Sequence, residues 1–300
     1  MQAQTLSSHS CATRDGEQAQ PWDCDLLVVG SGAGALSTAV TAAHLGLKVI
    51  VVEKDPHYGG TTAWSGGWMW IPRNPLALKG GIAEPIEKPL SYLRHELGEQ
   101  FDESRARMFL THGPRMVRFF QEHTALQFID GNSIPDFHGR TPDAVLGGRS
   151  VCAAPFDGRL LGPRIQQLKT PLRETTFLGM GIASGAEIRH FFNALRAWAS
   201  FWYVAKRVAR HLLDCVFHGR GMHLVNGNAL VAAMAKSAFD LGVEIRVNCP
   251  AVRLLTENTL DGQTKVRGAV VLHQGSEISI RAKRGVMLAT GGFPHDADRK

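Results

Sequence analysis

The segment from Asp25 to Glu53 constrains the fold more than any other part of the chain. It begins with a short apolar run, DLLVVG, which is typical of a buried parallel strand. Small residues then predict a helix that continues to about Leu45, with Gly46 placed to end it. Lys48–Val52 predicts a second buried strand that ends at Glu53. The order strand, helix, strand predicts a βαβ unit and therefore a parallel sheet.

The turn between the first strand and the helix has the spacing G-x-G-x-x-G/A. Its first glycine allows a sharp turn, its second lets backbone amides approach a pyrophosphate, and its small third residue keeps the helix close to the sheet. A helix N-terminus also offers N–H donors and the positive end of a dipole to phosphates. We expect this turn to hold the pyrophosphate of a dinucleotide through Gly30, Ser31, Gly32, Ala33, Gly34 and Ala35.

Glu53 follows Gly30 by 23 residues at the end of the second strand. A carboxylate at this place is expected to accept hydrogen bonds from an adenosine ribose. NAD, NADP and FAD all bind to this type of turn. Lys54 is a basic residue of the kind that can accompany a 2′-phosphate, but Glu53 would repel that phosphate, which argues against NADP. The choice between NAD and FAD needs a second segment.

Gly59–Pro72, GGTTAWSGGWMWIP, supplies that second segment. An extended FAD needs a second clamp, because its flavin end lies well beyond the first βαβ unit. We name Gly59–Gly67 the clamp, and we expect its hydroxyls and free backbone amides to face the flavin side through Thr61, Thr62, Ser65, Gly66 and Gly67. Trp68 and Trp70 share one face if the chain is extended there. We expect them to hold the clamp against the fold, with lining of the approach to the flavin as the alternative.

The rest of the chain predicts a mixture of helices and short strands. Helical spacing covers about 86–128, a loop with a short hairpin covers 131–170, and a long aromatic-rich helix covers about 186–217. Asn226 is expected to cap a helix that reaches about Leu241. Short strands are expected at 243–247, 252–255, 266–273 and 277–281, and a fully apolar strand at 285–289 leads into Thr290, Gly291 and Gly292.

The predicted fold is therefore α/β: a Rossmann-like FAD-binding domain whose parallel sheet has flanking helices, with a small antiparallel sheet and a helical insertion. We expect a disordered tail at 1–22 and one domain at 23–300. Within that domain, 23–80 forms the first βαβ unit and the clamp, 81–217 a mainly helical insertion, and 218–300 the second crossover, the small sheet and the return strand.

Composition narrows the classes of function. Five scattered cysteines without a C-x-x-C pair suggest neither a zinc site nor a disulfide framework, so we expect no metal and a cytoplasmic protein. No transmembrane segment and no secretory signal is expected. The net charge of +6 is modest, and no nucleic-acid partner is expected. The one basic cluster is interpreted as a solvated helix face beside a buried aromatic face, with a membrane-surface or nucleic-acid role as the alternative: Lys206, Arg207, Arg210 and His211.

Three stretches together resemble one family. The N-terminal stretch VVGSGAGALSTAVTAAHLGLKVIVVEKDPHYGGTTAWSGGWMWIP is similar to the start of the fumarate reductase/succinate dehydrogenase flavoproteins, the FAD-dependent oxidoreductase 2 type. It is most similar to the 3-ketosteroid dehydrogenase branch. The stretches GRGMHLVNGNALVAAMAKSAFDLGVEIRVNCPAVRLL and RGVMLATGGF resemble the family's second crossover and its return strand. The resemblance covers about residues 24–296.

The resemblance implies an FAD-dependent oxidoreductase acting on CH–CH groups. In such enzymes a hydride passes between flavin N5 and a carbon near an activating carbonyl, while an acid or base handles the proton. It implies a small-molecule substrate, here a hydrophobic 3-ketosteroid-like ketone or enone in steroid metabolism, and it does not identify the electron acceptor. Val252 matches the family's backbone contact to adenine, and Thr290, Gly291 and Gly292 match a segment that returns to the cofactor.

One departure from the steroid Δ1-dehydrogenases concerns a loop of the form D-Y-Y-P-E, which carries a tyrosine of their site. The matching segment here, Pro135–Arg140, has no tyrosine and offers His138 as the candidate acid, base or carbonyl donor. By resemblance, a substrate-capping domain and a C-terminal FAD segment follow the point where this chain ends. We therefore expect an incomplete domain, with the principal acid and base residues beyond Lys300.

Two other functions remain open at the level of sequence. One is a fumarate-reductase-like enzyme acting on a small unsaturated carboxylate. The other is a truncated FAD-binding module without turnover.

Overall fold

A computed structural model describes residues 21–183, 187–258 and 262–292 of the chain. Its centre is a six-stranded sheet in the order β10-β2-β1-β13-β12-β11. Three of its pairings are parallel: β1 with β13, β1 with β2, and β10 with β2. The sheet strands are β1 (Trp22–Val29), β2 (Val49–Val52), β10 (Glu244–Arg246), β11 (Ala251–Asn258), β12 (Thr264–His273) and β13 (Ser276–Leu288). The α/β fold is confirmed.

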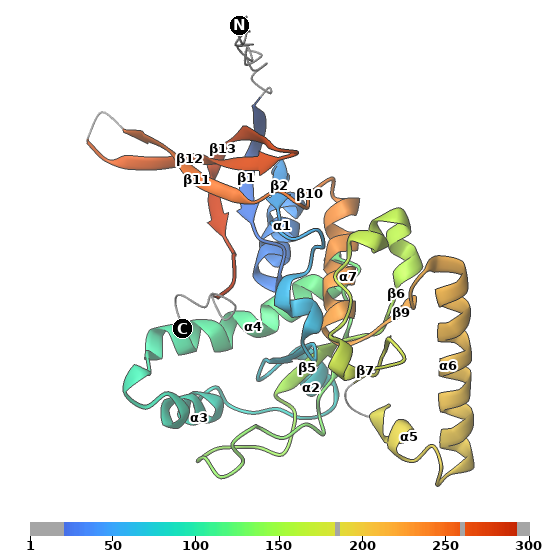
Figure 1. The fold of residues 1–300 in the computed structure, drawn as a ribbon. Helices are drawn as coiled ribbons and strands as arrows, with labels where there is room; N and C mark the ends of the chain where they lie inside the picture. The colour runs from blue at the N-terminus through green and yellow to red at the C-terminus, as the bar shows by residue number, and fades with distance from the viewer. Residues whose placement is uncertain (1–20, 184–186, 259–261, 293–300) are drawn as a thin grey trace, which may run out of the picture.

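Alternation along the strands divides the core between the two faces of the sheet. Val28, Val49 and Val51 pack with the helices α1 (Ala33–His44) and α7 (Asn226–Asp240). On the opposite face, Leu27, Val29, Ile50 and Val52 pack with residues of β12 and β13, so the antiparallel part of the sheet bends over that face. Both helices therefore cover one face, and a β layer covers the other. Figure 1 shows β11–β13 extending across one end of the molecule.

The return strand is longer than the sequence predicts. The stretches 277–281 and 285–289 were expected as separate strands, but they form one strand, β13. Residues 276–281 pair antiparallel with β12, and residues 280–288 pair parallel with β1, with a register shift between Cys24 and Leu26. The antiparallel hairpin is consequently part of the main sheet. Hydrogen bonding to β1 carries the strand across the expected break at 282–284.

The insertion mixes helices with short strands. The helical stretch 86–128 is broken into α3 (Glu87–Leu97) and α4 (Glu103–His123), where Gly98 has a φ of 52° and Asp102 caps the next helix. The expected loop at 131–170 contains β5 (Ser150–Ala153), β6 (Phe156–Asp157) and a 3₁₀ segment at Gly158–Gln167, and β4 (Phe128–Asp130) directly precedes it. The remaining short elements are α2 (Pro75–Lys79), β7 (Thr176–Phe177), β8 (Met180–Gly181), β9 (His223–Leu224) and 3₁₀ turns at Gly98–Gln100 and Arg173–Thr175.

Three further expectations need comment. The long helix expected at 186–217 is two helices, α5 (Ile188–Phe192) and α6 (Trp198–His218). Asn193 is the C-cap of the first, and the extended Ala197 is the N-cap of the second. Its aromatic face was expected to be buried, but Trp198, Phe201 and Trp202 are exposed. The expected tail at 1–22 lies outside the described residues except at its end, where Trp22 already begins β1. None of the described helices has both the length and the apolar character needed to cross a membrane.

Candidate functional site

The glycine-rich turn is shaped by a close approach of two backbones. Gly30 has a φ of +104°, and a Cβ there would lie 2.3 Å from the carbonyl oxygen of Ala289 at the end of β13. Gly32 precedes α1 in an extended conformation, and the first turn of α1 contains no acidic residue. The helix N-terminus is thus free of negative charge at the place where a pyrophosphate was expected. The turn fits the phosphates of a dinucleotide.

Ser31 joins the turn to the ribose carboxylate and to the clamp. Its buried Oγ donates to Glu53 Oε2 at 2.5 Å and accepts from the backbone N–H of Gly59 at 2.9 Å. Glu53 is buried at the end of β2, and its Oε1 accepts from the backbone N–H of Asp55 at 3.0 Å. Lys54 is exposed beside it. The sequence singled out Ser31 only as part of the turn, and its bridging hydroxyl follows from the fold.

The clamp lies directly against the turn. Its first half is a 3₁₀ helix, Gly60–Trp64, from which Thr62 Oγ1 accepts from the backbone N–H of Ala33 at 3.0 Å. Its second half contains Ser65, whose Oγ accepts from the Gly67 N–H, while Thr61 and Gly66 are exposed. The structure thus brings the turn, the carboxylate and the clamp together, as the sequence predicts. Gly34 and Ala35 lie within the first turn of α1.

Trp68 and Trp70 form a short strand that holds the end of the clamp. This strand, β3 (Trp68–Trp70), pairs with β5 in a three-stranded sheet. The ring of Trp70 stacks on Phe109, and its Nε1 donates to Asp136 Oδ1 at 2.7 Å. Arg149 is 1% exposed and links the same Asp136 to Glu84. The two tryptophans contact the insertion, in agreement with the expected holding role.

The start of α7 is a part of the site that sequence reasoning missed. A Cβ on Gly227 would lie 1.9 Å from the Thr62 carbonyl oxygen, and the Gly227 N–H donates to the Ser65 carbonyl at 2.9 Å. Asn226 was expected as the N-cap, but Val225 holds that position; Asn226 has a φ of 57°, and its side chain donates to the Ile182 carbonyl. The Asn-Gly pair was the available signal, since it favours such positive φ angles.

Lys169 is a second residue that the sequence did not indicate. Its Nζ lies 2.7 Å from Asp55 Oδ2 and 4.5 Å from the ring centre of Trp64 in the clamp. Burial alone would raise the pKa of Asp55, but hydrogen bonds from Lys169 Nζ and from the His57 N–H outweigh it and lower that pKa. The backbone of Lys169 also bonds to Tyr58. This segment therefore contacts the clamp through Trp64 and the chain just before it through Asp55 and Tyr58.

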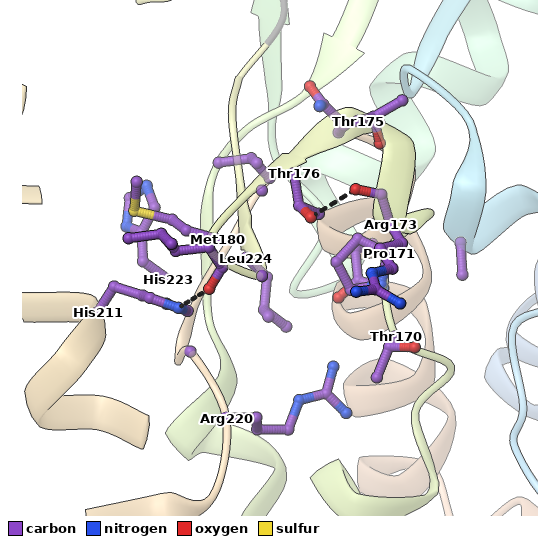
Figure 2. Close-up of a pocket in the computed structure, with 18 of the residues that line it drawn as sticks. Thr170, Pro171, Arg173, Thr175, Thr176, Met180, His211, Arg220, His223 and Leu224 are labelled. Carbon is purple, nitrogen blue, oxygen red and sulfur yellow. Dashed lines mark hydrogen bonds between the residues drawn. The ribbon is translucent and has the colours of Figure 1, made fainter. Parts of the chain in front are cut away.

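A cavity of about 430 Å³ lies beside the clamp. Figure 2 shows Arg173, Thr175 and Thr176 on one side of it and His211 and His223 on the other. None of the six turn residues lines it, whereas the clamp contributes Ala63, Trp64 and Ser65. Among the described residues, its other lining comes from 170–181 and 211–228: Thr170, Pro171, Arg173, Thr175, Thr176, Leu178, Gly179, Met180, Gly181, His211, Cys215, Gly219, Arg220, Gly221, His223, Leu224, Val225, Asn226 and Asn228.

Two polar atoms of the cavity wall lack a hydrogen-bond partner within the described part of the chain. They are Nε2 of His223 and Oδ1 of the buried Asn228, whose Nδ2 donates to the Lys169 carbonyl. Burial, followed by the positive charge of Arg207, lowers the pKa of His223 below its ordinary value. His223 is therefore neutral at pH 7. Both atoms are buried and unpaired among the described residues, which is the condition that a polar group of a small ligand can satisfy.

His138 lies in the loop between β4 and β5. In the described residues its Nδ1 bonds to Glu96 Oε2 on α3, and no bond links it to the clamp or the turn. The hydrogen bonds from Thr141 and His138 lower the pKa of Glu96. The neighbouring Phe137, where the resemblance leads one to look for tyrosine, is fully exposed. A catalytic role of His138 remains a prediction.

The remaining expected contacts differ in how near they come to the turn. The Ala289 N–H donates to the carbonyl of Val29, which directly precedes Gly30. Thr290, Gly291 and Gly292 follow Ala289 and therefore start beside the glycine-rich turn. Val252 is 51% exposed on the edge strand β11. The chain meets Glu53 three residues earlier, where the Cys249 N–H bonds to the Glu53 carbonyl. Across the described ranges, no group of three or more metal-ligating side chains is present.

Comparisons with known proteins agree with this geometry. The model of the FAD binding domain family matches residues 25–300. The chain is 36% identical over 287 residues to 4-oxocyclohex-2-ene-1-carboxylate 5-dehydrogenase of Sinomonas cyclohexanicum, an alignment that covers 91% of the chain and 47% of that protein. It is 34% identical over 281 residues to 3-oxosteroid 1-dehydrogenase of Mycobacterium tuberculosis H37Rv, with 91% and 48% covered. The chain thus spans about half the length of these relatives.

A solved structure extends the comparison to three dimensions. The crystal structure of 3-ketosteroid Δ1-dehydrogenase from Sterolibacterium denitrificans with 1,4-androstadiene-3,17-dione matches with a TM-score of 0.80 at 32% identity, covering 90% of this chain and 48% of that one. A flavocytochrome c3 fumarate reductase shares the fold at a TM-score of 0.53 and 18% identity, with 91% and 34% covered. The matched turn, the buried carboxylate and the clamp agree with one conclusion: the chain belongs to the FAD binding domain family.

Proposed function

We propose that this chain is the cofactor-binding part of an FAD-dependent oxidoreductase that acts on a carbon–carbon bond near the carbonyl of a ring ketone. The observation that carries the proposal is the meeting of the glycine-rich turn, buried Glu53 and the clamp, together with relatives, 34–36% identical across 91% of the chain, whose names describe dehydrogenases of ring ketones. The resemblance to fumarate reductases rests on fold alone. A 3-ketosteroid or a smaller oxocyclohexane ring is the substrate class that this supports.

The residues of the cradle divide the binding of FAD among them. The first turn of α1 and the backbone at Gly30 would face the pyrophosphate, Glu53 the ribose, and the clamp the flavin side. When bound, FAD supplies the hydride acceptor or donor. Ser31 contributes by holding Glu53 and Gly59 at fixed positions through two short hydrogen bonds. The protein's part is thus to position the cofactor before a substrate arrives.

The cavity beside the clamp is the site that we assign to the ketone ring. Its volume falls within the range of about 300–1,000 Å³ that is typical of small-molecule sites. Ser65 belongs both to the clamp and to the cavity wall, so a ring held there lies next to the flavin end of the cradle. Neutral His223 offers Nε2 to a ketone or hydroxyl oxygen. This contact would orient the ring, and Asn228 would add a second polar contact.

A flavin titration tests the proposal. The chain is purified, reconstituted with FAD and mixed without oxygen with one of three reductants: a saturated 3-oxosteroid, 4-oxocyclohexanecarboxylate or succinate. Loss of the yellow flavin colour with either ring ketone supports the proposal. Loss of colour with succinate alone, or a yellow protein that no reductant bleaches, would contradict it as a description of this chain. A chain that binds no FAD would contradict both the cradle and the function.

Paired variants locate the two parts of the site. Glu53→Gln is expected to weaken FAD binding by roughly tenfold or more, because a charge-assisted hydrogen bond to the ribose is lost. Glu244→Gln, at the start of the neighbouring strand β10, is the matched control and should leave FAD affinity unchanged. His223→Leu should raise the ketone concentration needed for bleaching and leave FAD affinity unchanged. An effect of His223→Leu on FAD alone would contradict the assignment of the cavity.

We also propose that the protein works in the cytoplasm. Its described cysteines are free, and burial raises the pKa of Cys24, Cys152 and Cys249 to about 11. Free thiols scattered through the core suit a reducing compartment. Fractionation of cells that express the chain tests this point, and recovery from an oxidising compartment with disulfides formed would contradict it.

A further inference from the structure

Helix α6 buries a polar face and exposes an apolar one, the reverse of a typical amphipathic helix. Its buried residues are Ser200, His211 and Asp214, all polar. The opposite face is exposed and apolar, and it consists of Trp198, Phe201, Trp202, Leu212, Leu213, Val216 and Phe217, which we name the apolar stripe. Its members recur at spacings of three and four residues, with Ala205 and Ala209 continuing the row between them. One side of a 21-residue helix is thus apolar and uncovered.

Specific contacts fix this orientation. Asp214 bonds to Arg159 Nη2 at 3.0 Å and to the Met222 N–H at 3.1 Å, and His211 Nε2 lies 3.0 Å from the Leu178 carbonyl. Rotating the helix to bury the stripe would break all three and would leave Asp214 without its partners. Figure 1 shows α6 at the outer edge of the molecule, with α5 at one end of it. Exposed Phe192 and Leu195 extend the apolar surface toward α5.

The charges around the stripe have one sign. Between residues 187 and 218 the exposed charged side chains are all basic: Arg189, Arg196, Lys206 and Arg210. Asp214 is buried in its bond to Arg159, and Glu187 is partly buried. Lys206 and Arg210 lie one turn apart and flank the stripe on the same side. An apolar stripe with such a basic border complements a surface that is apolar inside and negatively charged at its boundary.

We propose that the α5–α6 face binds the surface of a lipid bilayer that contains anionic lipid. Helices with Trp, Phe and Leu on one side and Lys and Arg at the border lie in the plane of the membrane interface, with the apolar side among the acyl chains. Tryptophans such as Trp198 and Trp202 favour that depth. A second copy of the chain fits less well, because it would present the same basic border and no exposed acidic side chain between residues 187 and 218 to complement it. The proposal is independent of the proposed oxidoreductase function.

A vesicle flotation experiment tests the proposal. The FAD-reconstituted chain is mixed with vesicles of phosphatidylcholine alone or of phosphatidylcholine with phosphatidylglycerol. We expect flotation with the anionic vesicles, weaker flotation with the neutral ones, and a loss of the difference at high salt because charges are screened. Absence from both vesicle fractions overturns the proposal, and so does equal binding that salt does not change.

Matched variants connect the binding to this face. Leu212 and Leu213 are 52% and 59% exposed, and Leu78 and Leu97, on α2 and α3, are 49% and 45% exposed. L212S/L213S should weaken vesicle binding by about tenfold or more, since two apolar side chains no longer enter the bilayer. The control L78S/L97S should leave binding unchanged. Equal effects of the two pairs would overturn the assignment to α6.

The basic border has its own matched pair. K206Q/R210Q should weaken binding to anionic vesicles by roughly 30-fold and leave binding to neutral vesicles nearly unchanged. K88Q/R118Q, which removes one exposed lysine and one exposed arginine from α3 and α4, is the control and should have no such effect. Neither charge variant changes a residue of the apolar stripe. The membrane proposal can therefore still be tested with them if L212S/L213S fails to fold.

Sedimentation distinguishes the membrane from a second copy. We expect the chain without lipid to sediment with the same mass before and after L212S/L213S. If the unchanged chain is a dimer that this variant dissociates, and if it also fails to float, the stripe is a subunit interface and the proposal is wrong. FAD absorbance is followed throughout. A chain that retains its flavin but does not float would overturn the membrane proposal without contradicting the proposed FAD site.

Discussion

Gly30 is the residue whose backbone the cofactor site depends on most directly. Its φ of +104° is one that residues with a Cβ rarely adopt, and its Cα lies against the backbone of Ala289 and Thr290. The turn, the start of α1 and the end of β13 can meet only if this position has no side chain. The spacing of the glycines predicted this need from sequence, because it is a property of the local backbone.

Gly30→Ala is therefore expected to cost about 3 kcal/mol of unfolding free energy or more and to abolish FAD binding, because the new Cβ meets a carbonyl oxygen. Gly139→Ala, in the β4–β5 loop, is the matched control, since nothing lies within 4 Å of its added Cβ. It should leave both quantities nearly unchanged. Urea unfolding and flavin absorbance measure both variants, and similar losses in the two would contradict this account.

His223 connects the cavity to the pH dependence of stability. Because its pKa in the folded chain lies below the ordinary value of 6.5, the unfolded chain takes up the proton first as the pH falls. The stability that neutral His223 supplies is therefore present above pH 6.5 and is lost as the pH falls through the lower folded pKa.

His223→Gln removes this titration, so its stability should decline less than that of the unchanged chain between about pH 7 and about pH 5. Urea unfolding at both pH values measures the difference. His218→Gln, at the exposed end of α6, is the control. If the unfolding free energies of the His223→Gln variant and the unchanged chain fall equally between the two pH values, burial of His223 does not cause the loss of stability at low pH.

At the scale of elements, the contact between the clamp and α7 leaves no space for an added side chain at Gly227. Gly227 places its Cα against the Thr62 carbonyl and the Ser65 hydroxyl, so the clamp can approach the start of α7 only because the second residue of that helix lacks a side chain. Helix propensity alone would favour alanine at this position. Packing between two distant segments outweighs that preference.

Gly227→Ala should lower the unfolding free energy by about 1–3 kcal/mol through overpacking and should weaken FAD binding further by displacing the clamp. Gly139→Ala, in the β4–β5 loop with nothing within 4 Å of the added Cβ, should change neither quantity. Flavin fluorescence gives the affinity, and urea unfolding gives the stability. Wild-type FAD affinity in a destabilised Gly227→Ala variant would show that the clamp moves independently of α7.

At the scale of the whole molecule, β13 joins the two halves of the sheet. Ile280 is fully buried near its middle and pairs with Trp22 of β1 and Ala269 of β12. The parallel and antiparallel parts therefore share one strand and one core. A separate antiparallel module would unfold by itself, whereas this arrangement favours unfolding together with the cofactor cradle.

Ile280→Ala should cost about 2–5 kcal/mol and should shift the loss of β structure and the release of FAD by the same amount, because the cavity weakens both parts of the sheet. Circular dichroism and flavin absorbance follow the two events in one denaturant series. Release of FAD that stays at its original denaturant concentration while the circular dichroism transition moves would contradict the shared core.

The sequence by itself determined the first βαβ unit, the turn, Glu53 and the clamp. These features depend on short-range requirements: strand and helix periodicity, glycines at strained backbone positions, and a carboxylate at a strand end. The same local information placed Asn226 at the wrong helix position and divided β13 into two strands. In both cases the outcome depended on a partner far away in the chain, the Ile182 carbonyl in one and β1 in the other.

Only the tertiary structure decided what meets the clamp and what covers α6. Lys169 and Gly227 lie more than a hundred residues from the clamp in sequence. No local pattern marks Lys169, and the Asn-Gly pair at 226–227 signals a turn without indicating which segment packs against it. The periodicity of α6 shows that one face is apolar, but it does not say whether that face is buried. The bonds of Asp214 and His211 settle the question by holding the polar face inward, which leaves the aromatic face at the surface.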